Sequence, residues 1–167
     1  NINVPTATES IVESIVLVAI DIQFAGYVVI ADELKEDAKE TITNLHKVGI
    51  KNIMMLSGDK DSITQQVAKE LNIENAKGGL LPEDKLNEVE ILKKNPENKI
   101  AFIGDGINDA PVLAASNVGI AMGGLGSDVA IETADVIIQT DQPSKVVRAI
   151  KISHSTRKIV WQNIILA

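Results

Sequence analysis

Apolar and polar positions divide the chain into a short first part and a longer second part. Two β-branched runs, at 15–20 and 27–31, flank a segment that contains Asp21 and Gly26, and this pattern predicts a β-hairpin. From residue 34 onward, short aliphatic runs alternate with segments in which apolar residues recur every three or four positions, as on one face of a helix. The predicted strands of this second part are 53–56, 99–103, 118–121 and 135–138. The predicted helices are 34–48, 63–71, 82–92, 108–115, 127–133 and a long one from 144 to the end.

The strands of the second part are continuous apolar runs rather than alternating ones. Strands of that kind are covered by helices on both faces, as they are in parallel sheets. The alternation of strand and helix therefore predicts an α/β fold with a doubly wound, Rossmann-like parallel sheet, which binds ligands beyond the carboxyl ends of its strands. The changes of pattern divide the chain into residues 1–31, a core of residues 32–143 and a long helix of residues 144–167.

Composition restricts the partners and the chemistry available to this chain. With 45% hydrophobic but only 2% aromatic residues, the core must be built from aliphatic side chains and alanine. The net charge of −7 and the absence of an evident basic cluster argue against nucleic acid or an anionic membrane as a partner. The chain has no cysteine, which excludes disulfides and thiolate metal sites. An acidic chain that handles phosphate needs a divalent cation.

The segment 104–111, with the sequence GDGINDAP, directly follows a predicted strand and contains the strongest candidate site. Asp105 and Asp109 lie four residues apart, beside Gly104 and Gly106, which allow the backbone to approach a ligand closely. Mg²⁺ prefers one or two carboxylates together with waters and phosphate oxygens. The helix predicted next presents free amides, which favour anions. Locally, a magnesium–phosphate site and a turn with solvated acidic side chains explain the pattern equally well.

Two further polar groups stand where a strand ends or a helix begins. Ser57, Gly58 and Asp59 follow the first aliphatic strand of the second part, where a hydroxyl can donate to a phosphate oxygen. Asp59 alone is more simply explained as a cap of the next helix. Lys85 follows Pro82 in the first helical turn, where the helix dipole disfavours a cation unless a negative group lies close. A phosphoryl group would supply that charge, whereas a solvated surface lysine is the simpler alternative.

In this order, the three groups resemble the motifs of the haloacid-dehalogenase superfamily. The amino-acid sequences of these motifs are more similar still to those of heavy-metal P-type ATPases of the zinc, cadmium, lead and cobalt type. Residues 55–59 (MLSGD) resemble that family's MLTGD segment, with serine in place of threonine, and residues 81–85 (LPEDK) match its P-x-x-K. Residues 104–111 match GDGxNDAP in full, and the segments 126–135 and 157–163 are also similar to the family. The resemblance covers all but about the first 15 residues.

The resemblance implies a haloacid-dehalogenase-like fold and a part in forming and hydrolysing an aspartyl phosphate, with ATP as the substrate. In the family, Mg²⁺ is bound beside that phosphate, and the matching ligands here are Asp105 and Asp109. The matching phosphate partners are Ser57 and Lys85.

Other residues of the same motifs acquire roles by the same resemblance. Asp59 matches the acid that lies close to the nucleotide and the phosphate, and Asn108 matches a residue that helps to hold phosphate or the attacking water. Gly58, Gly104 and Gly106 match the backbone turns at which the cofactor and the phosphate approach.

One segment of the family pattern has no counterpart in this chain. The phosphorylated aspartate of these pumps lies in an upstream DKTGT segment, and neither Asp21 nor Asp32 is followed by Lys-Thr-Gly. The resemblance therefore implies that residues 1–31 end a nucleotide-binding domain and that the missing amino-terminal part of the same pump is a partner. The helix of residues 144–167 would lead into membrane spans, so the chain would be a cytoplasmic portion of a cell-membrane protein. By itself, the chain is expected to be inactive.

Two other interpretations are open on the sequence alone. A non-catalytic module could keep the Mg²⁺- and phosphate-binding groups without the nucleophile. A soluble phosphatase of the same superfamily would need the aspartate that is missing here. The apolar residues from 159 to the end favour the pump, because an exposed apolar end is unfavourable in a soluble module.

Overall fold

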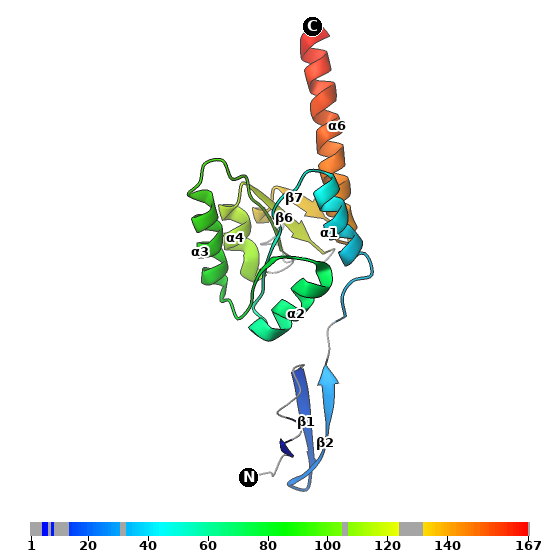
Figure 1. The fold of residues 1–167 in the computed structure, drawn as a ribbon, viewed down its shortest axis with the longest axis vertical. Helices are drawn as coiled ribbons and strands as arrows, with labels where there is room; N and C mark the ends of the chain where they lie inside the picture. Colours follow the sequence, from blue (N-terminus) through cyan, green and yellow to red (C-terminus); the bar gives the residue numbers. More distant parts are fainter. Residues whose placement is uncertain are drawn as a thin grey trace.

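The computed structural model describes residues 5, 6, 8, 14–30, 33–104, 107–123 and 132–166. Figure 1 shows three parts in chain order, which are a hairpin, an α/β body and a long helix, α6 (Ser144–Leu166), that projects from the body. The hairpin and the free end of α6 lie at opposite ends of the molecule.

The predicted hairpin is confirmed, with a tighter turn than the sequence indicates. Strand β1 (Ser14–Ile20) pairs antiparallel with β2 (Gln23–Ile30), which begins four residues earlier than predicted. The turn residues Asp21 and Ile22 have φ of 48° and 67°, and two central residues with positive φ match the right-handed twist of a hairpin. Apolar side chains are exposed along both strands, from Val16 onward. The hairpin therefore presents an uncovered apolar surface.

The body contains the alternating strands and helices that the sequence predicts. It also contains β4 (Asn75–Lys77), which the sequence analysis missed because the strand has three residues and a single apolar side chain. The helix predicted at 127–133 falls largely outside the described residues. The remaining elements of the body are α1 (Ala38–Lys47), β3 (Met54–Leu56), α2 (Asp61–Leu71), α3 (Pro82–Lys93), β5 (Ala101–Gly104), the 3₁₀ helix η2 (Ile107–Asp109), α4 (Ala110–Ala115), β6 (Val118–Met122) and β7 (Val136–Ile138).

Every strand pair of the body is parallel, which agrees with the predicted doubly wound sheet. Strand β3 pairs with β4, and β5, β6 and β7 form a second group in that order. Within the described residues, these two groups do not pair with each other. The prediction that helices cover both faces holds for β6, where four of five residues are buried, but is wrong for β5, where Ile103 is 40% exposed. Strand β5 is less covered because it lies at the edge of its group.

The core is aliphatic, as the composition predicts. Leu45 of α1 and Val146 and Val147 of α6 pack against the buried side chains of β6 and β7. On the other side of the body, α3 lies beside α4 (Figure 1), and Val89 of α3 and Leu113 of α4 are almost completely buried. The packing of Val146 and Val147 against β6 and β7 attaches the first turns of α6 to the body.

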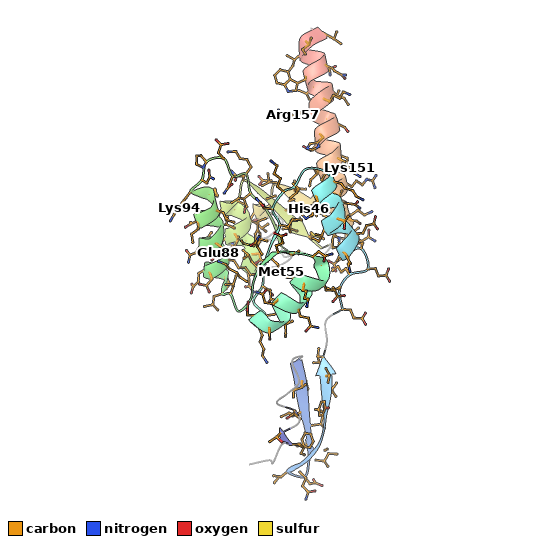
Figure 2. All side chains as sticks on the ribbon, in the orientation of Figure 1. His46, Met55, Glu88, Lys94, Lys151 and Arg157 are labelled. Carbon is orange, nitrogen blue, oxygen red and sulfur yellow. The ribbon has the colours of Figure 1, made fainter. Side chains whose placement is uncertain are left out.

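Beyond those first turns, α6 leaves the body. All side chains from Lys151 to Leu166 are exposed, and Figure 2 shows Lys151 and Arg157 on the part of the helix that stands clear of the other elements. None of the helices in the described part of the chain is both long and apolar enough to cross a membrane.

A hydrogen bond and an ion pair connect the start of α6 to the segment before α1. Asp37 Oδ2 accepts from the Ser144 amide at 2.9 Å, and the Lys35 ammonium pairs with Asp141. The Ser144 side chain and amide, both hydrogen-bonded to Asp37, lower the pKa of this carboxyl from its ordinary value of 3.8. A free amide at a helix start needs such an acceptor. The ionised Asp37 therefore stabilises the start of α6.

We expect Asp37→Ala to lower the free energy of unfolding at pH 7 by about 1 kcal/mol, because it removes this cap. The folded-state pKa is depressed, so the contribution is complete above the unfolded pKa and is lost as pH falls below 3.8 towards the folded value. Urea denaturation at pH 7 and pH 3 should thus show a difference between wild type and variant that shrinks at pH 3. Asp37→Asn keeps an acceptor and is the control; a difference from wild type independent of pH for Asp37→Ala would contradict the assignment.

Candidate functional site

Ser57, Gly58 and Asp59 form a compact turn after β3. Ser57 Oγ donates to Asp59 Oδ2 at 2.8 Å, and the Asp59 amide donates back to Ser57 Oγ at 3.1 Å. The interpretation of Asp59 as a helix cap is wrong, since α2 begins after Lys60 and has no side-chain cap. The carboxylate instead orients the Ser57 hydroxyl. Asp59 is exposed and Ser57 is half-buried at the carboxyl end of the strand, where a ligand can reach them.

The loop between β4 and α3 joins this turn to the next helix. The Ser57 carbonyl accepts from the Leu80 amide at 3.0 Å, and the Ser57 amide donates to the Lys77 carbonyl at 3.0 Å. On the other side of the loop, Asp61 Oδ1 accepts from the Gly78 amide at 2.9 Å, and this bond lowers the pKa of the Asp61 carboxyl. The end of β3 and the residues before α3 are thus held against each other.

Helix α3 begins with Pro82 and carries Lys85 in its first turn. The Leu81 amide donates to Asp84 Oδ2 at 2.9 Å, which satisfies one free amide of the helix start. Lys85 extends to the end of β5, where its Nζ donates to Asp109 Oδ1 at 2.9 Å. Only 17% of the Lys85 side chain and 11% of the Asp109 side chain are exposed. Lys85 is therefore a paired and mostly buried side chain, and the simpler alternative of a solvated surface lysine is wrong.

Glycine at the end of β5 makes room for Asp109. A Cβ added to Gly104 would lie 2.8 Å from Asp109 Oδ2 and 2.9 Å from Asp109 Cβ. Such distances are below van der Waals contact, so only glycine allows the carboxylate to lie this close to the strand. Asn108, one residue earlier in η2, is exposed. The predicted ligand Asp105 and its neighbour Gly106 lie outside the described residues.

The structure thus connects three of the predicted positions. Lys85 and Asp109 are in direct contact, and Ser57 is joined to the start of the same helix through the backbone of Leu80. An ammonium, a hydroxyl and carboxylates at neighbouring element ends can bind a phosphate group together with a divalent cation. Among the described residues, no group of three or more acidic or histidine side chains is gathered closely enough to hold a metal alone.

Comparison with protein families matches residues 4–117, more than half of the chain, to the haloacid dehalogenase-like hydrolases. The chain belongs to this family. The parallel α/β body with its site at strand ends is the fold expected for it, and the fold class predicted from the sequence is confirmed.

Individual relatives within the family are named as metal-transporting ATPases. The zinc-transporting ATPase of Synechocystis sp. is 51% identical over 155 residues, which is 92% of this chain and 22% of the relative. The cadmium, zinc and cobalt-transporting ATPase of Bacillus subtilis is 51% identical over 153 residues, which is 90% of this chain and 22% of the relative. A crystal structure of a zinc-transporting PIB-type ATPase in an E2.Pi state has a TM-score of 0.78 at 38% identity and covers 95% of this chain and 26% of that one. The chain spans about a fifth of the length of these curated relatives.

Two positioning residues of this site were not predicted from the sequence. The sequence analysis assigned no role to Asp61 or Gly78. In the structure, a Cβ on Gly78 would lie 2.5 Å from Asp61 Cα. The glycine pair Gly78-Gly79, three residues before the helix that carries Lys85, was the signal that could have indicated a close backbone contact.

Proposed function

We propose that this chain is part of a heavy-metal P-type ATPase of the zinc and cadmium type. In that pump it would supply groups that bind phosphate and Mg²⁺ while an aspartyl phosphate forms and is hydrolysed. The observation that carries the proposal is the contact of 2.9 Å between Lys85 Nζ and Asp109 Oδ1, which joins the start of α3 to η2, next to the end of β5. The names of the relatives that match at least 90% of the chain support it.

In this proposal, Lys85 neutralises phosphate charge and Ser57 donates a hydrogen bond to a phosphate oxygen. Lys85 is held in place before a ligand binds by its contact with Asp109, whereas the single hydrogen of the Ser57 hydroxyl would exchange its bond to Asp59 Oδ2 for one to the phosphate. Donors that are already oriented towards developing charge stabilise a transition state without the cost of reorganisation. Asn108, exposed beside this pair, would bind phosphate or orient the attacking water.

The residues present suit Mg²⁺. Mg²⁺ prefers carboxylate oxygens, waters and phosphate oxygens, and it needs only one or two protein carboxylates. We propose Asp105 and Asp109 as those carboxylates, with Gly104 allowing the close approach of the second one. Bound there, Mg²⁺ would add positive charge beside the phosphate.

The chain would act only when joined to the rest of the pump. It contains no Asp-Lys-Thr-Gly sequence, and phosphoryl transfer has no acceptor without that aspartate. Among the described residues, β3 pairs only with β4, and β5 pairs only with β6, so each has one edge without a partner strand. A parallel strand from the missing amino-terminal part would pair with these edges and bring the aspartate between Ser57 and Asp109.

Two further predictions belong to the same proposal. The exposed apolar hairpin β1–β2 would be covered by the nucleotide-binding part of the pump, which binds ATP. The chain as a whole would lie on the cytoplasmic side of the cell membrane, attached to downstream membrane helices, without a nucleic-acid partner.

A chimera tests the proposal, with this chain replacing the matching segment of the Bacillus subtilis relative. We expect the membrane-inserted chimera to form a phosphoenzyme from labelled ATP in the presence of Zn²⁺, whereas the chain alone forms none. Ser57→Ala in the chimera should lower the rate of phosphoenzyme formation about 100-fold, as expected for loss of one oriented donor.

Ser155→Ala is the matched control, since Ser155 is a serine on exposed α6 whose hydroxyl donates to the Lys151 carbonyl of its own helix. This variant should keep the full rate. A chimera that inserts into the membrane and binds ATP without forming a phosphoenzyme, or a Ser57→Ala chimera as fast as the control, would refute the proposed role.

A further inference from the structure

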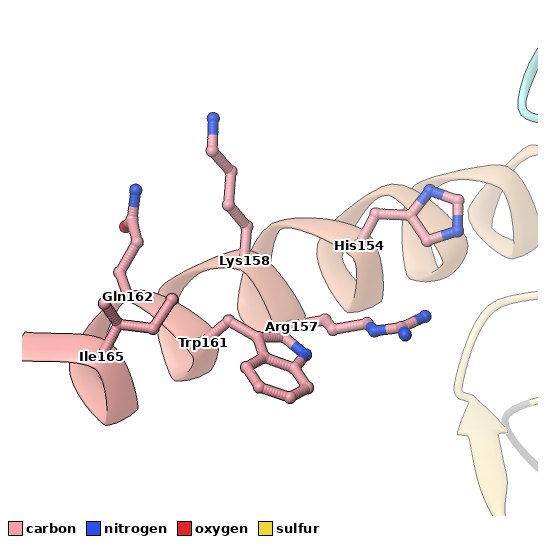
Figure 3. Close-up of a pocket in the computed structure, with 6 residues that line it drawn as sticks. All are labelled: His154, Arg157, Lys158, Trp161, Gln162 and Ile165. Carbon is pink, nitrogen blue, oxygen red and sulfur yellow. The ribbon is translucent and has the colours of Figure 1, made fainter.

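A hollow and a polar network lie outside the contacts between Ser57, Lys85 and Asp109. Figure 3 shows the hollow, which is lined by six residues of α6, among them Trp161 and Ile165. Because all six come from one exposed helix, no second element of the described residues fixes a ligand there. The network, in contrast, joins α2 to residues 76–78, which precede α3. It therefore connects two separate elements of the body.

The network is a clamp made by Asp61 and Gln65, which lie one turn apart on α2. Asp61 Oδ1 accepts from the Gly78 amide at 2.9 Å and from Gln65 Nε2 at 3.2 Å. Gln65 Nε2 also donates to the Ala76 carbonyl at 2.9 Å. A glutamine amide has two hydrogens to donate, and the clamp uses both of them. Residues 76 and 78 are thus both fastened to α2.

The carboxylate of Asp61 is the centre of this clamp. The bond from the Gly78 amide, and next the bond from Gln65, lower the pKa of the Asp61 carboxyl from its ordinary value of 3.8. The group is therefore charged at neutral pH, and hydrogen bonds to a charged acceptor are stronger than those between neutral groups. An Asp and a Gln four positions apart are also an ordinary contact on a helix surface. Here, however, the partners Gly78 and Ala76 lie 17 and 11 positions away along the chain, in another segment.

The segment that the clamp holds connects Ser57 with Lys85. Lys77, between the two fastened residues, accepts at its carbonyl from the Ser57 amide at 3.0 Å, and its ammonium pairs with Glu88 of α3 at 2.7 Å. The Leu80 amide donates to the Ser57 carbonyl at 3.0 Å, and α3 with Lys85 in its first turn follows directly. The path of residues 76–80 therefore sets where α3 begins relative to Ser57.

We propose, on the basis of the function proposed above, that Asp61 and Gln65 are positioning residues that hold Ser57 and Lys85 at the spacing needed to bind one phosphate together. Both side chains are exposed at the surface of α2, so their loss would free residues 76–78 without opening the core. A misplacement of about 1 Å at a reacting group can lower a rate about 100-fold. The clamp would thus act on the reaction through Ser57 and Lys85.

The chimera with the Bacillus subtilis relative measures this effect as the rate constant of phosphoenzyme formation. We expect Asp61→Ala and Gln65→Ala each to lower the rate constant about tenfold, which is less than a full misplacement would cost because the backbone bonds of Ser57 remain. The rate constant is the readout, because partial unfolding reduces the amount of phosphoenzyme formed and leaves its rate constant unchanged.

Two further variants separate the hydrogen bonds from charge and from surface changes in general. Asp61→Asn removes the charge but keeps an oxygen that accepts from the Gly78 amide, so it should recover most of the rate constant. Gln66→Ala is the matched control for Gln65→Ala, because Gln66 is the next residue of α2, is exposed and takes no part in the clamp. This variant should keep the full rate constant.

Hydrogen exchange in the purified chain tests the clamp without phosphoryl transfer. For Asp61→Ala, the protection of the Ser57 and Leu80 amides should fall about fivefold, the factor that corresponds to the net contribution of one hydrogen bond. The Asp135 amide, which donates to the Gly119 carbonyl in the β6–β7 pair, should keep its protection. A general loss of stability would lower the protection of all three amides alike.

Three results would overturn the role of the clamp. These are equal rate constants for the Asp61→Ala and Gln66→Ala chimeras, an Asp61→Asn chimera as slow as Asp61→Ala, and unchanged protection of the Ser57 and Leu80 amides. Failure of the unchanged chimera to form any phosphoenzyme would refute the proposed function instead, and the exchange of these amides would then decide whether the clamp holds the loop.

Discussion

Replacing Lys85 with methionine is expected to lower the free energy of unfolding by about 3 kcal/mol at neutral pH. Lys85 Nζ and Asp109 Oδ1 are 2.9 Å apart, and both side chains are mostly buried. The variant would leave the Asp109 carboxylate against the backbone of Gly104 without a cation and with little access to water. Urea denaturation measures the loss, and the lower end of the range for buried pairs applies because neither side chain is completely buried.

A second substitution and a surface pair make this prediction specific. Lys85→Met/Asp109→Asn removes the unpaired charge as well, and it should recover about 1 kcal/mol relative to Lys85→Met. Lys77 and Glu88 form a similar pair at 2.7 Å, but their side chains are 49% and 21% exposed. Lys77→Met should therefore cost less than about 1 kcal/mol. Equal losses for Lys85→Met and Lys77→Met would show that the pair at the site has no special role.

Gly78→Ala is expected to be as damaging, with a loss of about 3 kcal/mol in the free energy of unfolding. The added Cβ would lie 2.5 Å from Asp61 Cα, 2.6 Å from Thr64 Oγ1 and 2.9 Å from the Asp59 carbonyl oxygen. Two of these atoms belong to the backbone, and Thr64 is 2% exposed, so the neighbours cannot move aside easily. The loop that precedes Lys85 must shift instead. Urea denaturation measures the loss, and the Gly78 and Leu80 amide resonances should report the shift by NMR.

The adjacent glycine provides the control. Gly79 has φ of +68°, and a Cβ there would meet nothing within 4 Å. Gly79→Ala should therefore cost only about 1 kcal/mol, from the unfavourable backbone conformation rather than from a collision. If the two alanine variants proved equally stable, the close packing of Gly78 against α2 would not be a determinant of this loop.

Local patterns predicted most of the secondary structure, and they failed where an element has little pattern of its own. The strands β3 and β5 follow from continuous aliphatic runs, and α3 follows from Pro82 and its helical spacing. Strand β4 was missed because three residues with one apolar side chain form a strand only by pairing with β3. The cap proposed for Asp59 was also wrong, because its carboxylate accepts a hydrogen bond from the Ser57 hydroxyl and none from a helix amide in the described residues.

For the candidate site, too, local patterns predicted the individual residues but not the contacts between them. The sequence motifs indicated Ser57, Lys85 and Asp109 as separate candidate site residues, because each stands at the end of a strand or the start of a helix. Nothing local could show that Lys85 contacts Asp109, which is 24 positions away along the chain. That contact depends on how α3 returns the chain from β4 to β5, and on the absence of a side chain at Gly104.

By itself, the sequence determined the α/β class, the aliphatic core and the residue types that can handle phosphate and Mg²⁺, because these depend on local periodicity and on side-chain chemistry. Only the tertiary structure decided which of those residues meet, which strand edges have no partner among the described residues, and which face of each helix is covered. It also separated the charges, placing five basic residues and no acidic one on a helix that leaves the body. Contacts between distant segments follow from packing in three dimensions, and no pattern along one segment contains that information.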